Sequence, residues 1–297
     1  MNLNMQEEED SSKLLFEKWD ISFVGIPLDD RGNVANSFIE INSEKVIEVK
    51  YDAYEMALMV DGKLALIDDL DEFFSFIEKK RILIESTTMS FAEMLLILKQ
   101  TKQYDCDISI LYLEPKSYSQ IRTPLIIHRR EFELSHETPG FFPIPGFIKS
   151  YSDDIVKRTI FIAGYESERI DRAIEANSIP SNNCALIFGV PAFQAGWEMN
   201  SFANNIAVIK EQRLISEPYF SSANNPGSTY DILEEVYKSL DQDEELFIAP
   251  LGPKPGGIAT ALFLVENEDV SVFYDHPNKT PTRSKEVNKW HLYDIKF

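Results

Sequence analysis

The stretch from Leu246 to Leu264 combines the residue types that bind an anion. Its sequence, LFIAPLGPKPGGIATALFL, predicts a buried strand, then a glycine- and proline-rich turn carrying Lys254, then an apolar helix. That order brings a helix N-terminus, free backbone N–H groups and an ammonium group to one point, and all three favour negative charge. The turn is neither a Walker A loop nor a GxGxxG loop. We expect Gly252, Lys254 and Gly256 to contact a ligand; the alternative is a sharp turn with Lys254 in solvent.

Further ligand contacts are expected where the other strands end, because open α/β sheets bind ligands beyond the carboxyl ends of their strands. The residues that follow the expected strands there are Thr87, Thr88, Gly164, Tyr165, Gly189 and Asp275. Each has a structural alternative. The hydroxyls could cap the helix whose capping box is Ser90–Glu93, the glycines could only shape turns, and Asp275 could begin a turn with His276.

No residues have the spacing of a known catalytic or metal centre. The four histidines form no HxH or HExxH pattern, and GxSxG is absent. We therefore assign no catalytic residue and no metal ligand, and the sequence indicates no particular cofactor. An enzymatic alternative stays open, with Asp275, His276 or Glu85 as acid or base and Lys254 stabilising charge.

Composition limits the function classes. The chain has 297 residues, of which 44% are hydrophobic, which is enough for a large packed core. Its net charge of -20 disfavours general nucleic-acid binding. Two basic clusters could still form local anion patches or solvated faces: Arg122, His128, Arg129 and Arg130, and Lys279, Arg283, Lys285 and Lys289.

Location and redox state follow from the same composition. Cys106 and Cys184 are expected to be reduced core residues, because no disulfide framework or CxxC pair is present. No apolar run approaches the ~20 residues that span a bilayer, and the acidic N-terminus lacks the features of a signal peptide. We expect a cytoplasmic protein with no membrane association.

The pattern of elements changes along the chain. Residues 1–13 are expected to be a disordered acidic tail, and residues 14–75 a β-rich antiparallel segment with a strand at 37–41 and a hairpin turn at Asp61-Gly62. Strands and helices then alternate over 76–297, which predicts one doubly wound, mostly parallel, Rossmann-like α/β sheet. The proline-rich interval 114–158 is expected to be an irregular insertion.

The order strand–Gly–x–Lys–x–Gly–helix, carried here by Gly252 and Lys254, resembles the Gly-Gly-Thr-Lys-type loop of CARF domains. The architecture of residues 80–275 is similar to that family, and the segment 86–90 lies where the family contacts its ligand; Pro253 stands where the family usually has Thr. The resemblance implies a sensor of cyclic oligonucleotides in prokaryotic antiviral defence that acts as a dimer.

Three functions remain open at this point. We expect a sensory or binding protein that holds a nucleotide-like anionic ligand and acts through a protein partner or a homodimer. The alternatives are an enzyme acting on a nucleotide or phosphorylated metabolite, and a non-catalytic accessory subunit of a defence complex that docks through 114–158. Fold alone does not separate these functions.

Overall fold

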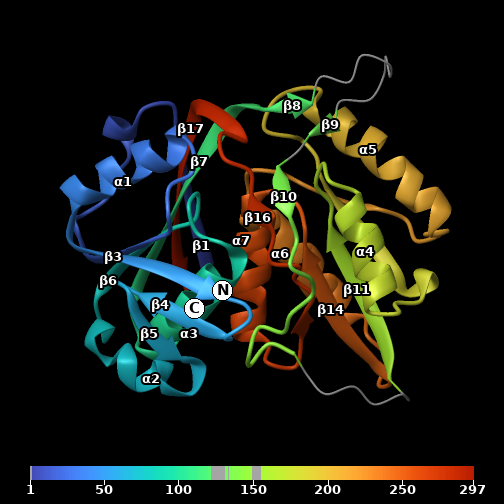
Figure 1. The fold of residues 1–297 in the computed structure, drawn as a ribbon, viewed down its shortest axis with the longest axis horizontal. Helices are drawn as coiled ribbons and strands as arrows, with labels where there is room; N and C mark the ends of the chain where they lie inside the picture. Colours follow the sequence, from blue (N-terminus) through green and yellow to red (C-terminus); the bar gives the residue numbers. More distant parts are fainter. Residues whose placement is uncertain (1, 122–130, 133, 149–154) are drawn as a thin grey trace. The chain divides into compact units, whose positions relative to one another are not determined.

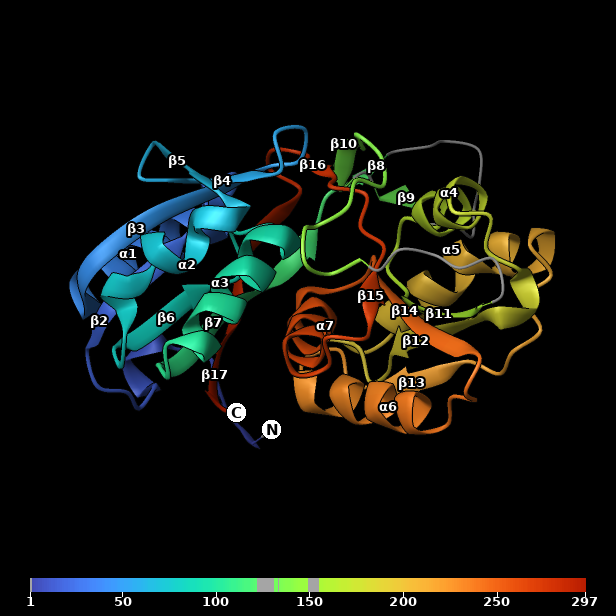
Figure 2. The same ribbon diagram turned by 90° about the horizontal axis from the view of Figure 1, so that it is seen from below.

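A computed structural model describes residues 2–121, 131–132, 134–148 and 155–297. The chain divides into two compact units (Figures 1 and 2). Unit 1 comprises residues 1–119 and 279–297, and unit 2 comprises residues 120–278. The last strand, β17, therefore returns to the sheet that the N-terminal half begins.

Unit 1 is built on an eight-stranded sheet with the order β1-β17-β7-β6-β2-β3-β4-β5. Its strands are β1 (Asn2–Glu8), β2 (Trp19–Val24), β3 (Ser43–Asp52), β4 (Ala57–Val60), β5 (Lys63–Leu66), β6 (Arg81–Glu85), β7 (Asp107–Tyr118) and β17 (Ser284–Lys296). The central strands β7, β6, β2 and β3 are parallel. In chain order this is 2-1-3-4, the order of flavodoxin-like doubly wound sheets, extended at both edges by antiparallel strands.

The helices of unit 1 begin at local capping signals. They are α1 (Asp30–Asn42), α2 (Leu70–Phe73) and α3 (Phe91–Gln103), with short 3-10 turns at Ser11–Lys13, Ile67–Asp69 and Ser75–Ile77. Asp29 caps α1, and the Ser90–Glu93 capping box starts α3. α1 packs on the sheet face that carries Leu83 and Leu111; because side chains alternate along a strand, Ile82 and Ile84 face the other side.

Unit 2 is built on a five-stranded parallel sheet with the order β13-β12-β11-β14-β15. These strands are β11 (Val156–Ile162), β12 (Cys184–Gly189), β13 (Tyr219–Ser221), β14 (Glu244–Pro250) and β15 (Ser271–Val272). In chain order this is 3-2-1-4-5, a Rossmann-like sheet. The shorter strands are β8 (Gln120–Ile121), β9 (Glu131–Phe132), β10 (Ser135–Glu137) and β16 (Asn278–Lys279), the last at the boundary of the units.

Helices cover both faces of the unit 2 sheet. They are α4 (Glu168–Ala176), α5 (Trp197–Glu211), α6 (Pro226–Lys238) and α7 (Lys254–Glu266), with a 3-10 turn at Ser181–Asn183. Figure 2 shows α4 and α5 on one face and α6 and α7 on the other. One core cluster joins Phe161 and Phe247 of the sheet to Ile170 of α4 and Val208 of α5. α7 is buried nearly all round, because almost every residue after its first turn is apolar.

The predicted fold class is confirmed, whereas the predicted division of the chain is wrong. The expected single sheet over 76–297 is two sheets, since the strands at 81–85 and 108–113 pair within unit 1. Residues 14–75 are likewise part of the unit 1 sheet and no separate β-rich segment. The interval 114–158, expected to be an insertion, contains the chain's passage from unit 1 to unit 2, and part of it lies outside the described residues.

Two local predictions also fail. Residues 37–41 lie in α1 because Ala35 and Ile39, one turn apart, both reach the core. Residues 2–8 form a strand because β1 pairs with β17 along its whole length. The hairpin is confirmed: Asp61 (φ 47°) and Gly62 (φ 73°) both adopt the positive φ of a type I′ turn.

Candidate functional site

The candidate site lies where the strand order of unit 2 reverses. The chain runs outward from β11 through β12 to β13, and then crosses to β14 on the other side of β11. Ligands of such sheets bind beyond the carboxyl ends of the strands at this switch point. The residues placed there are 163–167, after β11, and 251–254, after β14. Four predicted ligand contacts therefore lie in these two segments, Gly164, Tyr165, Gly252 and Lys254, and Gly256 follows in the first turn of α7.

Two glycines allow these loops to touch. A Cβ on Gly164 would lie 2.8 Å from the Leu251 carbonyl oxygen, and a Cβ on Gly252 would lie 2.8 Å from the Ala163 carbonyl oxygen. Real Cβ atoms do not approach backbone that closely, so any other residue would push the loops apart. The glycines of both loops are thus required for close contact at the switch point.

The first turn of α7 lies on the end of β11. A Cβ on Gly256 would lie 2.7 Å from Cγ2 of Ile162. Pro253 precedes the helix and supplies no capping side chain. The first-turn N–H groups of an α-helix have no partner within the helix, so the positive end of α7 lies at this edge together with the half-buried Lys254.

Side chains from α5 hold the loop after β11. The Gly164 carbonyl accepts hydrogen bonds from Ser201 Oγ (3.0 Å) and Asn205 Nδ2 (2.8 Å), and the Tyr165 carbonyl accepts one from Asn204 Nδ2 (3.0 Å). All three donors are buried. Because each peptide is planar and trans, the N–H that follows a carbonyl points the opposite way. The N–H groups of Tyr165 and Glu166 therefore point away from the donor side chains of α5.

A buried ion pair joins the first turn of α4 to two loops of this edge. Arg169 of α4 donates from Nε and Nη2 to Asp275 (2.8 and 2.6 Å) and from Nη1 to the Leu251 carbonyl (3.2 Å). Burial by itself would lower the pKa of Arg169, but the Asp275 carboxylate outweighs it and the net shift is upward. Asp275, predicted as a ligand contact, is only 2% exposed, and Arg169 binds both of its carboxylate oxygens.

The other acid-base candidates, His276 and Glu85, also have polar partners within the protein. His276 Nε2 lies 3.0 Å from the Phe142 carbonyl oxygen, and burial lowers the pKa of its imidazole. Glu85 belongs to unit 1, where it accepts the N–H groups of Thr87 (2.7 Å) and Thr88 (2.8 Å). These interactions brace loops. For His276 this agrees with the turn that the sequence left open as an alternative, whereas for Glu85 the sequence offered no structural alternative.

Thr87 and Thr88 lie at the carboxyl edge of the other sheet, in unit 1. Thr88 Oγ1 accepts the Gly25 N–H (2.8 Å), and Thr87 Oγ1 accepts the Leu113 N–H (3.0 Å). Lys279 donates to the carbonyls of Thr88 (2.5 Å) and Met89 (2.8 Å). Both threonines are buried, so their side chains act as braces within unit 1.

The aromatic and glycine candidates of unit 2 have neighbours of their own. The Tyr165 ring stacks on Phe132 with 4.4 Å between ring centroids, so one of its two faces is covered. A Cβ on Gly189 would lie 3.0 Å from the Ala223 side chain, which places the end of β12 against the residues that follow β13.

No described residue of the two basic clusters belongs to unit 2, where the switch point lies. Arg122, His128, Arg129 and Arg130 lie outside the described residues. Of the second cluster, Lys279 binds the carbonyls named above and Lys289 pairs with Glu7. Cys106 and Cys184 are both free thiols; Cys184 is buried as predicted for a core residue, whereas Cys106 is only half-buried.

Sequence reasoning missed Arg169, Ser201, Asn204 and Asn205. The last three carried a weak signal, because polar residues at spacings of three and four lie on one face of a helix. Nothing local distinguishes Arg169 from the other charged residues of α4.

Comparison with known proteins does not assign the chain to a family. No protein-family model matches the chain, and no curated protein matches it either. Among solved structures, a ketoreductase domain from the bacillaene assembly line is similar over 90% of this chain and 70% of that chain, at 12% identity and a TM-score of 0.22. A score this low transfers no activity, so the Rossmann-like assignment rests on the strand order itself.

In the described part of the chain, no helix has the length and apolar character needed to cross a membrane.

Proposed function

We propose that the chain binds a nucleotide-like anion at the carboxyl edge of the unit 2 sheet, on the surface formed by the loops 163–167 and 251–257. The observation that carries the proposal is the coincidence of the β11–β14 switch point with the start of α7 at Lys254. Ligands of open α/β sheets bind at that position, and a helix N-terminus with a lysine favours a negative charge there.

The local charges must overcome the field of an acidic chain. Arg169 contributes little to this, because Asp275 neutralises it. The start of α7 contributes about 0.3–1 kcal/mol, and a charge-assisted hydrogen bond from Lys254 about 1.5–3 kcal/mol. Their sum is about 2–4 kcal/mol, and only its upper end reaches the ~4 kcal/mol of millimolar affinity. A ligand of biological affinity therefore needs a second moiety, which supports a nucleotide over free phosphate.

Binding is better supported than catalysis. An acid or base must reach the ligand with a carboxylate or imidazole that is not already engaged. Arg169 binds both oxygens of Asp275, and the Phe142 carbonyl lies at hydrogen-bond distance from His276. A role as a sensor that acts through a protein partner or a homodimer is consistent with these engaged groups.

The test is a thermal-shift titration of wild type, Lys254→Ala and Lys238→Ala. Lys238 is a matched control because it lies on α6 of the same unit and pairs only at the surface, with Glu234. A ligand at 100 times its dissociation constant adds about 2.7 kcal/mol of stability. We expect a nucleotide-dependent shift in wild type and Lys238→Ala that is lost in Lys254→Ala. No shift with any nucleotide, or an equal shift in all three proteins, would contradict the proposal.

The resemblance of the Gly252–Lys254 turn to the CARF loop selects the first ligands to test. Cyclic di- and oligonucleotides should be compared with linear mono- and dinucleotides and with inorganic phosphate. Size-exclusion chromatography with and without the best ligand then tests the homodimer. A response to linear nucleotides alone would keep the anion site and remove the proposed sensing of cyclic nucleotides in antiviral defence.

A further inference from the structure

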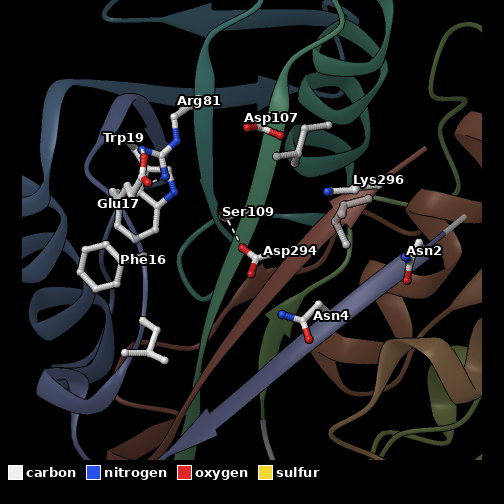
Figure 3. A pocket seen from close by; sticks show the side chains of 13 residues that line it. Asn2, Asn4, Phe16, Glu17, Trp19, Arg81, Asp107, Ser109, Asp294 and Lys296 are labelled. Atoms are coloured by element: carbon white, nitrogen blue, oxygen red, sulfur yellow. Dashed lines mark hydrogen bonds and ion pairs between the residues drawn. The ribbon is translucent and has the colours of Figure 1, made fainter.

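Unit 1 has a cavity of about 490 Å³ at the edge of its sheet where the parallel strands begin, opposite the carboxyl edge that carries Thr87 and Thr88. Figure 3 shows its position next to the starts of β6 and β7 and beside β1 and the end of β17. Ligand pockets of proteins are about 300–1,000 Å³. The cavity is therefore large enough for a small molecule, and none of the predicted site residues lines it.

The floor of the cavity is the polar end of one face of the unit 1 sheet, formed by β1, β17 and β7. Asn4, Asp294 and Ser109 are register partners on β1, β17 and β7, so they lie in one row on one face. Two residues further along the same strands, the next row is Asn2, Lys296 and Asp107. In the other direction along β17 the same face carries Leu292 and Trp290, which are buried in the α1 core. The face thus changes from apolar to polar where the cavity begins.

The facing wall is a short apolar segment with a fixed backbone. Gln6 of β1 accepts the Leu15 N–H and donates to the Leu15 carbonyl, both at 2.8 Å. The Phe16 ring stacks on Trp19 with 4.5 Å between centroids. At the other end, Arg81 donates to the Glu17 and Lys18 carbonyls. Leu15 nevertheless leaves 80% of its surface exposed, so an anchored apolar side chain borders the cavity.

The charges of the floor select the kind of ligand. The lining carries charges of both signs, so a simple anion or a simple cation would each meet like charges: Glu17, Asp107, Asp294, Arg81 and Lys296. The amides of Asn2 and Asn4 both donate and accept, and Asp294 accepts from Ser109 through only one of its oxygens. A neutral ligand with many hydroxyl groups matches this mixed set, because each hydroxyl also donates and accepts. Its C–H groups would pack on Leu15 and Phe16.

We propose that this cavity binds a mono- or disaccharide, with its hydroxyl groups on the floor and its apolar face on Leu15 and Phe16. The site is separate from the proposed anion site, because every residue that lines it belongs to unit 1.

The test is isothermal titration of the full chain with glucose, galactose, N-acetylglucosamine and maltose. Asn4→Ala and Asp107→Ala remove exposed groups of the floor, and Leu15→Ser removes the exposed apolar wall, so all three should fold. The double variant Lys116→Ala/Glu286→Ala is the matched control, because it removes an exposed pair from the far ends of β7 and β17. Spermidine and inorganic phosphate serve as charged probes.

We expect saturable binding of at least one saccharide to wild type and to the control. Its dissociation constant should rise about threefold in Asn4→Ala and about tenfold in Asp107→Ala, in line with the loss of a neutral and a charged hydrogen-bonding group. Lys254→Ala should leave it unchanged, which separates this site from the anion site. The proposal is overturned if no saccharide binds, if the cavity variants bind as wild type does, or if only spermidine or phosphate binds.

Discussion

Removing the Asp275 carboxylate should destabilise unit 2 strongly. The perturbation is Asp275→Ala, which leaves the guanidinium of Arg169 buried with the Leu251 carbonyl as a neutral acceptor and Glu166 as a more distant carboxylate at 3.8 Å. The two side chains of the pair are 9% and 2% exposed, so solvent does not screen them. Breaking a buried pair by removing one partner costs about 3–5 kcal/mol.

Matched variants distinguish the effect of an unpaired buried charge from the effect of changing the side-chain volume at these two positions. Arg169→Met should cost a similar amount, because it leaves the Asp275 carboxylate buried without its partner. The double variant Arg169→Met/Asp275→Leu should recover most of the loss, since apolar replacement of a whole buried pair is often close to neutral. At about 2–4 °C per kcal/mol for domains of this size, each single variant should lower the melting temperature by roughly 6–20 °C.

Hydrogen exchange measured by mass spectrometry is the assay, because it reports on each unit separately. Amides of β11 and β14 should lose protection in both single variants, while amides of β6 and β7 should not change. The reasoning is refuted if a single variant costs less than about 1 kcal/mol in unit 2. It is also refuted if the double variant is as unstable as the two single losses added together.

Three further outcomes are expected. Gly252→Ala should destabilise unit 2 by roughly 1–3 kcal/mol in urea unfolding, because its Cβ would lie 2.8 Å from the Ala163 carbonyl oxygen. Burial would raise the pKa of Asp29, but Arg31, Ser284 and the Gly32 N–H outweigh it and lower that pKa below 3.8. The resulting stability is present above pH 3.8 and lost as pH falls through the folded-state value, so Asp29→Asn should flatten the acid side of a plot of urea midpoint against pH. Burial raises the pKa of Cys184 to about 12 and that of Cys106 to about 11; iodoacetamide at pH 8 should therefore label both slowly in the native protein and rapidly in urea, as counted by mass spectrometry.

Local sequence patterns are sufficient to predict individual helices and turns of the fold. The helix from Phe91 and the helix from Lys254 are apolar nearly all round, and Asp61-Gly62 is a local hairpin signal. The division into two sheets was not predictable, because strand pairing depends on residues far apart in the sequence. β6 and β11 are similar apolar runs, each followed by a turn and a helix, yet they belong to different sheets. β1 is held by its partner β17, although its own sequence resembles an acidic tail.

The candidate site likewise contains residues that the local sequence predicts and residues that it does not. Gly252 and Lys254 stood out because a strand, a glycine turn and a helix follow one another directly in the sequence. The braces of the site come from elsewhere: Arg169 reaches Asp275 across more than a hundred residues, and Asn205 reaches back to Gly164. Pattern reasoning finds a loop and its helix, but it does not find the side chains that fix the loop, because their contacts exist only after folding.

Helices α3 and α7, at the carboxyl edges of the two sheets, differ in how they begin. α3 begins with a capping box, in which Ser90 Oγ accepts the Glu93 N–H and the Glu93 carboxylate accepts the Ser90 N–H. α7 begins after Pro253 without a capping side chain. Pro253→Ser should supply a cap of about 1 kcal/mol, nearly offset by the ~0.4–1 kcal/mol lost with the proline.

The informative measurement for this variant is therefore the ligand response rather than stability. A serine cap would accept the Gly256 N–H, because Pro255 has no N–H to donate. It would compete with an anion for that donor, so the nucleotide-induced thermal shift should fall in Pro253→Ser and persist in the matched Pro253→Ala. Extended backbone at Pro253 (φ -66°, ψ 155°) suits a capping residue, so both substitutions should keep the turn. An equal response in the two variants would mean that the start of α7 does not contact the ligand, and the anion site would have to be sought at another edge.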